Sequence, residues 1–305
     1  MKKNHKTSLS AIVAIVLFQS CNLSSPIRVE HSIPINTSKF DGWNEIISQN
    51  PKIDEFKILN TGSVKVPLDG VLNIEKLTDE HGLKEFIWVD VFAFLFHHRD
   101  MGWYLIDTGL DSTFQQNGNI SGVLSSHYIK QTRQEKNQSI GAQLKAFGKH
   151  VNGIFLTHLH GDHTAGLPEI DKTIPKYIGM GEQFYNIPVL YNSNHFNASD
   201  TLRELDWSQG RKILPFETVI DIFGDESFFA VSTPGHSNSH TSYLLNTTNG
   251  LVLLTGDASH TKFGFLNNIE PGWGDDREKA ENSLQQLREF KRLFPETKVI
   301  YGHEE

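Results

Sequence analysis

Four residues with metal-ligating side chains lie within one short stretch of the chain. The segment from Thr157 to His163 reads THLHGDH, with histidines at positions 158, 160 and 163 and an aspartate at 162. His158 and His160 are two residues apart, so in an extended segment their side chains point the same way. Imidazoles together with a carboxylate are a ligand set typical of divalent transition metals. The H-x-H-x-D-H spacing therefore predicts a metal site.

Three later segments end in further ligand-type side chains. They read VSTPGH up to His236, LLTGD up to Asp257 and VIYGH up to His303. Each has an apolar run, a small or turning residue, and then a side chain that can bind a metal. Because ligands at the ends of successive strands converge in space, we expect these three residues to complete a site for a pair of ions.

The elements that must position these residues are short strands and a few helices. Short runs rich in β-branched and aromatic residues recur between Gly, Asn and Asp, a pattern typical of strands. We expect strands at 86–96, 103–106, 153–157, 227–232, 243–245, 251–254 and 298–301, and helices at 141–147 and from Asp275 or Asp276 to about Phe294. Paired strands followed by mixed strands and helices predict a layered α+β or α/β domain.

Composition narrows the class of protein. The 305 residues are 38% hydrophobic and 10% aromatic, which is enough to bury a core. Lys and Arg number 28 against 36 Asp and Glu, a net charge of −8, which argues against a nucleic-acid partner. The one cysteine, Cys21, excludes a disulfide framework and a cysteine-rich metal site, whereas histidine occurs 15 times.

The first 20 residues predict export. Lys2, Lys3 and Lys6 precede the short apolar run LSAIVAIVLF, which ends just before Cys21. This segment resembles a bacterial lipoprotein signal, which implies that Cys21 is lipidated and anchors the protein to a membrane of the bacterial cell envelope, on its periplasmic or outer surface. An ordinary cleaved signal with an incidental cysteine is the alternative.

The motifs together resemble those of the metallo-β-lactamase-fold hydrolases. THLHGDH is followed in the family's order by His236, Asp257 and His303, and LIDTG resembles the family's early strand-turn motif, with its aspartate at Asp107. The resemblance covers roughly residues 57–305, so we expect a tether and N-terminal extension at 21–56 and a hydrolase domain at 57–305. It implies an α+β fold, a four-layer αββα sandwich with the metals at one edge between two sheets.

The same resemblance implies a role for each predicted ligand. His158, His160 and His236 would bind one zinc ion, and Asp162, His163 and His303 would bind the other, with Asp257 bridging both. Two divalent ions share and activate a water molecule, so hydrolysis by a metal-bridging hydroxide is the expected reaction. Asp162 and Asp257 are expected to accept or shuttle its proton. For Asp107 two roles stay open, holding a ligand or loop in place and capping a turn.

The segments TPGHSNSH (233–240) and GDASH (256–260) most resemble the N-acyl-homoserine lactonase branch. In that branch a tyrosine three residues past the bridging aspartate helps to hold the substrate carbonyl, and here this position is His260. We expect His260 to be catalytic, as a hydrogen-bond donor to an oxyanion or as the acid for a leaving alkoxide. The alternative is a solvent-exposed loop histidine. His240 is expected to be structural.

A small lactone is therefore the expected substrate, and three alternatives stay open. A phosphodiesterase and a glyoxalase II-like thioesterase would use the same metal site, and a non-catalytic metal-binding surface lipoprotein would lack turnover. The motif loops contain few basic residues, with Lys262 the nearest, which favours carbonyl chemistry. Flavodiiron relatives carry a carboxylate in place of His160, and some β-lactamases need a cysteine ligand, so neither group fits this chain.

Two further segments are expected near the site. Phe263, Phe265 and Trp273, just after Asp257, would either line an apolar pocket or pack a loop against the sandwich. The insert at 172–206 contains four aromatic residues and is expected to act as a lid that sets substrate specificity: Tyr177, Phe184, Tyr185 and Phe196.

Overall fold

The computed structural model describes residues 27–31, 42–47, 51–77, 84–122, 124–184, 192–193, 195–196 and 200–305. The expected signal peptide and Cys21 lie outside these residues, as does Tyr185. In this described part of the chain, no helix combines the length and the apolar character that a membrane span requires.

The first half of the chain contributes most of one sheet. Its strands follow the order β1-β10-β8-β7-β4-β3-β2, and β6 also pairs with β2. β3 and β4, which correspond to the strands expected at 86–96 and 103–106, pair antiparallel, and β4 pairs with β7 in parallel. The strand bounds are Ile27–His31 (β1), Ile53–Pro67 (β2), Phe86–His98 (β3), Gly102–Ile106 (β4), Gln131–Arg133 (β6), Val151–Phe155 (β7), Lys176–Gly179 (β8) and Thr201–Leu205 (β10).

The second half forms the facing sheet. β11 to β15 pair in sequence order, and β16 pairs with β15 in parallel. The bounds are Arg211–Ile213 (β11), Phe216–Asp221 (β12), Phe228–Ser232 (β13), Thr241–Thr247 (β14), Gly250–Leu254 (β15) and Lys298–Ile300 (β16). A short bridge between Ile53 and Thr247 connects the two halves, and the Thr241 N–H also donates to the Thr157 carbonyl at 2.8 Å. A separate two-stranded sheet pairs Ile120–Ser121 (β5) with Asn192–Ser193 (β9).

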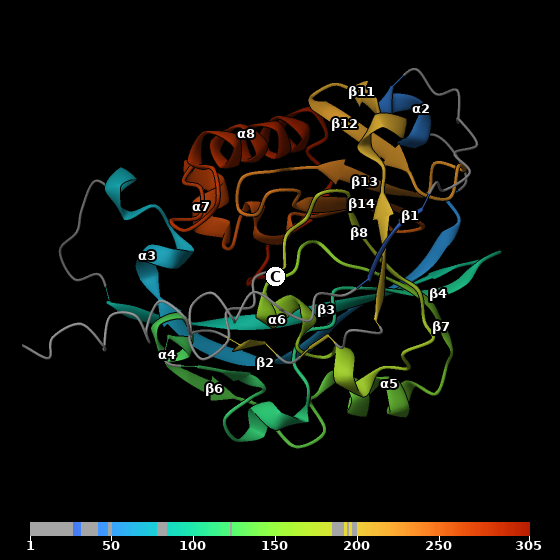
Figure 1. Cartoon of the computed structure of the whole chain (residues 1–305). Helices are drawn as coiled ribbons and strands as arrows, with labels where there is room; N and C mark the ends of the chain where they lie inside the picture. Colours follow the sequence, from blue (N-terminus) through green and yellow to red (C-terminus); the bar gives the residue numbers. More distant parts are fainter. Residues whose placement is uncertain are drawn as a thin grey trace, which may run out of the picture.

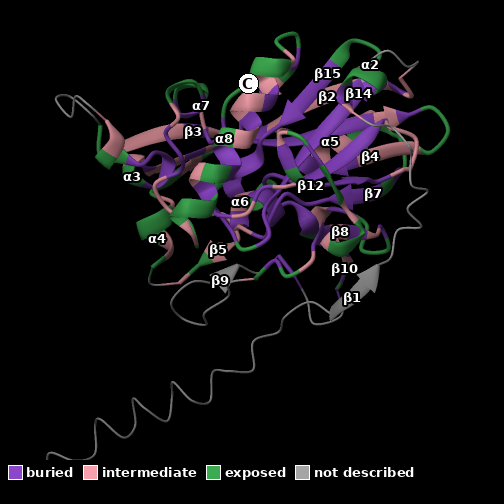
Figure 2. Cartoon of the chain, turned by 90° about the horizontal axis from the view of Figure 1, so that it is seen from above, coloured by how far each residue is buried: buried purple, intermediate pink, exposed green. Residues whose placement is uncertain are grey.

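Large aromatic side chains fill the space between the two halves. One buried cluster takes members from both, including Phe94, Phe96 and Phe155 from the first half and Phe228 and Tyr243 from the second. Burying a side chain of this size contributes about 1.5–3 kcal/mol, so this shared core holds the sheets face to face. Figure 2 shows the strands as the most buried part of the molecule.

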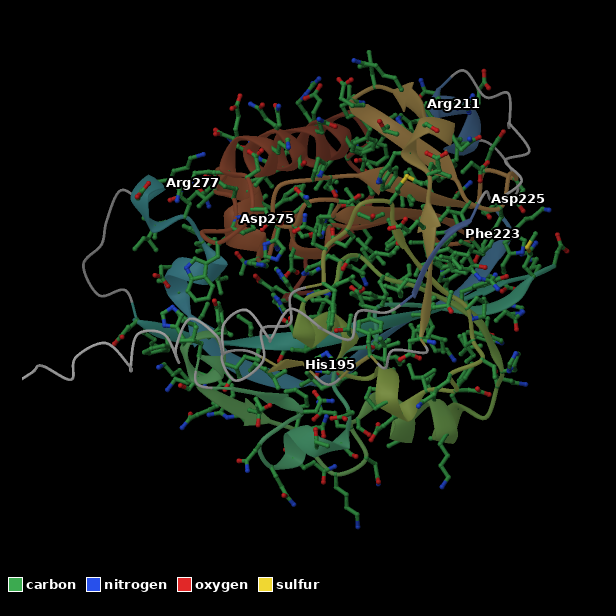
Figure 3. All side chains as sticks on the ribbon, viewed as in Figure 1. His195, Arg211, Phe223, Asp225, Asp275 and Arg277 are labelled. Carbon is green, nitrogen blue, oxygen red and sulfur yellow. The ribbon has the colours of Figure 1, made fainter. Side chains whose placement is uncertain are left out.

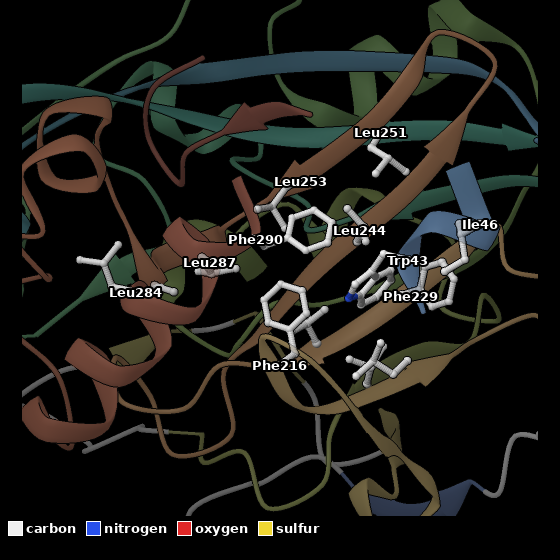
Figure 4. Close-up of a cluster of buried hydrophobic side chains, with 14 of the residues drawn as sticks. Trp43, Ile46, Phe216, Phe229, Leu244, Leu251, Leu253, Leu284, Leu287 and Phe290 are labelled. Atoms are coloured by element: carbon white, nitrogen blue, oxygen red, sulfur yellow. The ribbon is translucent and has the colours of Figure 1, made fainter. Parts of the chain in front are cut away.

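Helices cover the outer face of each half. Leu284, Leu287 and Phe290 of α8 (Arg277–Leu293) pack on the second sheet (Figure 4), and Ile140 of α5 (Ile140–Phe147) packs on the first. Figure 1 shows α8 and α5 on opposite sides of the paired sheets. The predicted four-layer αββα sandwich is confirmed.

The bounds of α8 follow from its sequence. The Asp276 side chain accepts a hydrogen bond from the Lys279 N–H at 3.1 Å, an N-cap that satisfies one otherwise unpaired donor. Its buried residues recur at helical spacing, and Phe294 is the C-cap. The predicted helix is therefore confirmed at both ends.

The packed chain extends further toward the N-terminus than residue 57. That expected domain start falls inside β2, which begins at Ile53. Upstream, α2 (Trp43–Ile47) lies against the second sheet, where the Trp43 ring makes edge contacts with Phe216 at 5.8 Å and with Phe290 at 5.3 Å. Part of the expected tether is thus built into the core, because Trp43 has aromatic partners there.

The remaining helices are short and lie in the connections between strands. They are α3 (Leu68–Val71), η1 (Ile74–Lys76), η2 (Ser112–Gln115), α4 (Ser125–Tyr128), α6 (Gly161–Thr164), η3 (Leu167–Glu169), η4 (Trp207–Gln209), η5 (Gly256–Ala258) and α7 (Lys262–Asn267).

Candidate metal centre

The loop after β7 carries four of the predicted ligands. β7 ends at Phe155, and its parallel neighbour β4 ends at Ile106, so the segments that follow the two strands leave the sheet at the same edge. His160 is the N-cap residue of α6, and the single turn of that helix presents Asp162 and His163.

The other three predicted ligands arrive from the second half. His236 follows β13, Asp257 lies in η5 after β15, and His303 follows β16. His303 Nε2 lies 3.5 Å from Asp162 Oδ2, which brings ligands from the two halves into one cluster. Figure 1 shows α6 and the end of the chain together between the sheets.

The first group of possible ligand atoms comes from His158, His160, His236 and Asp257. His236 Nε2 lies 2.9 Å from His160 Nδ1 and 3.3 Å from Asp257 Oδ2. His158 Nε2 lies 3.7 Å from the same carboxylate oxygen. Atoms bound to one zinc at about 2.0–2.1 Å are themselves roughly 3–3.5 Å apart in tetrahedral geometry, so this spacing suits a common ion.

The second group comes from Asp162, His163 and His303. Asp162 Oδ2 lies 3.9 Å from His163 Nε2. His163 Nε2 in turn lies 3.3 Å from Asp257 Oδ1. Asp257 thus lies between the groups: Oδ2 is near His236 of the first group, Oδ1 is near His163 of the second, and His303 of the second lies 3.6 Å from Oδ2.

Several atoms of this cluster are buried without a hydrogen-bond partner in the described structure, among them His158 Nε2, His163 Nε2 and Asp257 Oδ1. Leaving a buried polar atom unpaired costs about 1–3 kcal/mol. These atoms point into the two groups, where a bound cation would satisfy them. The donor set present in the chain therefore fits two divalent ions.

The histidines of the cluster differ in the direction in which their pKa is shifted. Burial holds the pKa of His158 and of His236 well below the ordinary value, so these rings are neutral and keep the lone pair that a metal needs. Burial also acts on His163, but the carboxylates of Asp257 and Asp107 outweigh it and hold the His163 pKa well above its usual range. Burial opposes ionisation of Asp257, yet the nearby histidines, His163 first, hold its pKa well below its ordinary value.

Asp107 fixes the loop that carries the ligands. Its Oδ1 accepts the Thr157 N–H at 2.8 Å, and its Oδ2 lies 2.8 Å from His163 Nδ1. A carboxylate accepts, so His163 Nδ1 donates and Nε2 is the nitrogen left for a metal. Asp107 itself has a φ of 52°, a conformation uncommon outside glycine. Of the two expected roles, the structure shows Asp107 holding a ligand in place.

His240 holds the loop that carries Asp257. Its Nε2 accepts the backbone N–H of Asp257 at 2.9 Å, so its other nitrogen carries the proton and donates to Thr233 Oγ1, also at 2.9 Å. Burial lowers the pKa of His240 to about 3, which keeps this arrangement neutral. The structural role predicted for His240 agrees with these contacts.

His260 is buried in the cluster, not exposed on a loop. Its side chain is 6% exposed, and Nε2 lies 3.1 Å from Asp257 Oδ2. Nδ1 lies 2.9 Å from the carbonyl oxygen of Val71, which can only accept, so Nδ1 carries a proton. The neutral ring therefore presents a lone pair at Nε2, and only the doubly protonated ring can donate from that atom.

A cavity of about 420 Å³ opens beside the cluster. His160, Asp162, His236, His260 and His303 form one side of it. The rest of the lining is mainly apolar and includes Val66, Val71, Val89, Ile120, Tyr128, Ile129 and Trp273. Among the described residues that line it, none is Lys or Arg, and Asp275 is a further acidic group (labelled in Figure 3).

The three aromatic residues after Asp257 have three different environments. Trp273 lines the cavity, where its ring stacks on His127 at 5.5 Å. Phe265 is buried against Tyr301, and Phe263 is 52% exposed. Both expected roles thus occur within this one segment, divided among its residues.

The expected lid has a different role in the part that is described. Tyr177 stacks on Phe155 in the core, and Phe184 packs against Phe196. None of the described residues at 172–206 lines the cavity. Part of the cavity lining comes instead from α3, β5 and α4. The sequence shows no signal for these elements, because their contact with the loops that carry the predicted ligands depends on tertiary packing.

Comparison with known proteins agrees with this geometry. The model of the Metallo-beta-lactamase superfamily matches residues 87–303. An N-acyl homoserine lactonase of Bacillus cereus is 29% identical over 211 residues, which covers 67% of this chain and 77% of the relative. The AiiA N-acyl homoserine lactonase of Bacillus thuringiensis subsp. kurstaki is 28% identical over 212 residues, with the same two shares.

Solved structures show the same fold. An N-acyl homoserine lactone hydrolase with N-hexanoyl-L-homoserine bound at its catalytic metal centre superposes with a TM-score of 0.62. It is 23% identical in sequence, and the match covers 83% of this chain and 94% of that one.

Proposed function

Because the chain belongs to the metallo-beta-lactamase superfamily, we propose that it is a metal-dependent hydrolase that uses two divalent ions, preferably zinc, to open a small lactone. The observation that carries the proposal is the cluster of unpaired ligand atoms, which opens on an apolar cavity that contains no described Lys or Arg.

The ligand assignment divides the cluster into two sites. His158, His160 and His236 would hold the first ion, and Asp162, His163 and His303 would hold the second, in the two groups described above. Asp257 would bind both, since its carboxylate lies between the groups, with Oδ2 near His236 and Oδ1 near His163. Two ions bound there would lower the pKa of a shared water and polarise the ester carbonyl of the substrate.

The chain's own residues supply proton transfer. The side chain of Asp162 is 20% exposed and lines the cavity, so its carboxylate can accept the proton of the attacking water. His260 stands at the cavity wall with its orientation fixed by Val71, and a proton carried on Nε2 can pass to the departing alkoxide. Ring opening creates that alkoxide, so an acid at this position lowers the barrier of the step.

The cavity favours an uncharged substrate with an apolar substituent. Its wall of aliphatic and aromatic side chains suits an acyl chain, and its volume is in the range of small-molecule sites. A phosphodiester would gain from a cationic side chain, and none of the described lining residues provides one. Relatives named N-acyl homoserine lactonases support the lactone class.

We also propose that the protein is exported and anchored to the cell envelope through a lipid on Cys21. This rests on the sequence of the first 21 residues alone. Metabolic labelling with a tagged fatty acid tests it: wild-type protein should be labelled and Cys21→Ser should not. Equal labelling of the two proteins would refute it.

Proton release by the zinc-loaded protein tests the lactonase proposal. We expect fast acid release from acyl-homoserine lactones and simple γ-lactones, and its loss in Asp162→Ala. If wild-type protein with two bound ions releases no acid from any lactone, the lactone proposal is wrong. Thioesters and phosphodiesters are then the substrates to assay.

A further inference from the structure

His158, His160 and His236 are called here the three-histidine site, and they come from the loops after β7 and β13. One buried carboxyl group that is not a predicted ligand lies beside these loops. Glu182 lies just after β8 and is 2% exposed. Its Oε2 accepts the Ser237 hydroxyl at 2.9 Å and the Ser239 N–H at 2.8 Å. Both residues lie within three positions after His236.

The same carboxyl group also faces the other loop. The backbone N–H of Leu159 acts on it and favours its charged form, which lowers the pKa of Glu182, and Leu159 lies between His158 and His160. One side chain thus spans the two segments whose histidines must converge on a single ion.

The packing around Glu182 leaves little room for the loops to move. Ser239 Oγ donates to the Met180 carbonyl at 2.8 Å, and Trp207 Nε1 donates to Ser239 Oγ at the same distance. A Cβ on Gly179 would lie 2.6 Å from the Ser239 carbonyl oxygen, so β8 approaches this loop as closely as glycine permits. The carboxyl group is therefore held on a rigid support.

We propose that Glu182 is a positioning residue that sets the distance between the His158–His160 loop and His236, and so sets the affinity of the three-histidine site for its metal. The inference rests on the metal site of the proposed function. Glu182 acts through Ser237, Ser239 and Leu159, and it contributes no ligand itself.

The protonation of Glu182 is consistent with this role. Burial raises its pKa to about 7, and the nearby carboxylate of Asp275 adds to the effect. Its Oε1 is buried with no hydrogen-bond partner in the described structure, which a proton or an amide group tolerates better than a charge. Glutamine keeps the accepting oxygen and should therefore replace Glu182 well, whereas alanine removes the connection.

The experiment measures metal affinity by chelator competition on the full-length protein, together with the visible spectrum of its Co²⁺ form. We expect Glu182→Ala to lower the affinity for one of the two ions by roughly 10- to 100-fold and to change the Co²⁺ absorption bands. Loss of a residue that orients a metal ligand typically has an effect of this size. Glu182→Gln should restore both the affinity and the spectrum. Ser237→Ala, which removes one of the donors, should have a smaller effect of the same kind and serves if Glu182→Ala does not fold.

Glu169→Ala is the matched control. Glu169 also connects two segments, through the Ser112 N–H at 2.9 Å and the Gly141 N–H at 3.0 Å, but neither segment carries a predicted ligand. It should lower the free energy of unfolding and leave metal affinity and the Co²⁺ spectrum unchanged.

Unchanged affinity and spectrum in folded Glu182→Ala, or an equal loss in Glu169→Ala, would overturn the inference. A wild-type protein that binds no pair of ions would instead refute the proposed function, so the two failures are distinguishable.

Discussion

His163 donates from Nδ1 to Asp107 Oδ2 at 2.8 Å, and this contact decides which nitrogen of His163 faces the metal cluster. Asp107→Asn tests its importance without changing the backbone, because asparagine tolerates the positive φ at this position. We expect the affinity for the second metal to fall roughly 10- to 100-fold. Chelator competition measures this, and unchanged affinity would mean that the orientation of His163 does not depend on the carboxylate.

Asp257 should couple metal content to activity. Asp257→Asn keeps the shape of the side chain but removes the charge shared by the two groups. We expect metal content and kcat/KM to fall together, by more than the roughly 10- to 100-fold that an outer partner contributes. Elemental analysis and initial rates check this in the same sample. Retention of both metals and full activity would rule out a bridging role.

His260 should affect turnover without affecting metal content. In His260→Ala the acid beside the leaving alkoxide is lost, and we expect kcat to fall about 100-fold, a typical contribution of general acid catalysis. Two bound ions should remain. Unchanged kinetics would assign His260 a purely structural role, and loss of one ion would make it a ligand.

Gly70 should set the width of the apolar side of the cavity. A Cβ at this position would lie 2.9 Å from the Trp273 ring, so Gly70→Ala must displace that ring. We expect kcat/KM for long-chain acyl lactones to fall about 10-fold relative to short ones, since one methylene in a pocket is worth about 1–3 kcal/mol. Gly42→Ala is the control, because a Cβ there meets no atom within 4 Å. An equal change for all chain lengths would contradict the assignment.

His195 should make stability depend on pH. Its Nδ1 lies 2.9 Å from Thr164 Oγ1 and its Nε2 lies 2.7 Å from Asn119 Oδ1, beside α6 (Figure 3). Burial lowers its pKa to about 3 from an ordinary 6.5, so the unfolded chain binds a proton between these values that the folded chain does not. The contribution of His195 to the free energy of unfolding is therefore complete above pH 6.5 and is lost as the pH falls, by about 1.4 kcal/mol per pH unit.

Urea unfolding of the metal-free protein at pH 7 and pH 5 measures this effect. His195→Gln keeps a donor for Asn119 but cannot titrate, so its stability should decrease less between the two pH values. Parallel losses in wild type and variant would show that other groups account for the pH dependence.

The sequence predicted those elements whose signals lie within a few residues of the element itself. The N-terminal cap of α8 at Asp276 lies where the sequence indicated it, because the signal and its effect are a few residues apart. His260 shows the opposite case. Its burial and its tautomer depend on Val71, which lies 189 residues earlier in the chain, and no local pattern reports such a contact.

The roles of the aromatic residues after Asp257 stayed open for a related reason. Phe263 and Phe265 lie two residues apart in the short helix α7, so one faces solvent and the other Tyr301. A helix of six residues gives too little periodicity to assign its faces beforehand. The ligand-type side chains that the structure brings together could be singled out from the sequence because their chemistry, and not their packing, identifies them.

The predicted ligands are divided between the two halves of the sandwich, so bound ions would have a structural role as well as a catalytic one. In the described structure the two halves meet mainly through side-chain packing, with few backbone contacts, such as the bridge at Ile53 and Thr247 and the hydrogen bond from the Thr241 N–H to the Thr157 carbonyl. Ions held by histidines of both halves would connect the halves in the folded state, and they would stabilise that state because the unfolded chain does not hold the ligands together. The sequence has a single cysteine and so cannot form a disulfide within the chain, which would leave metal coordination to take that stabilising role.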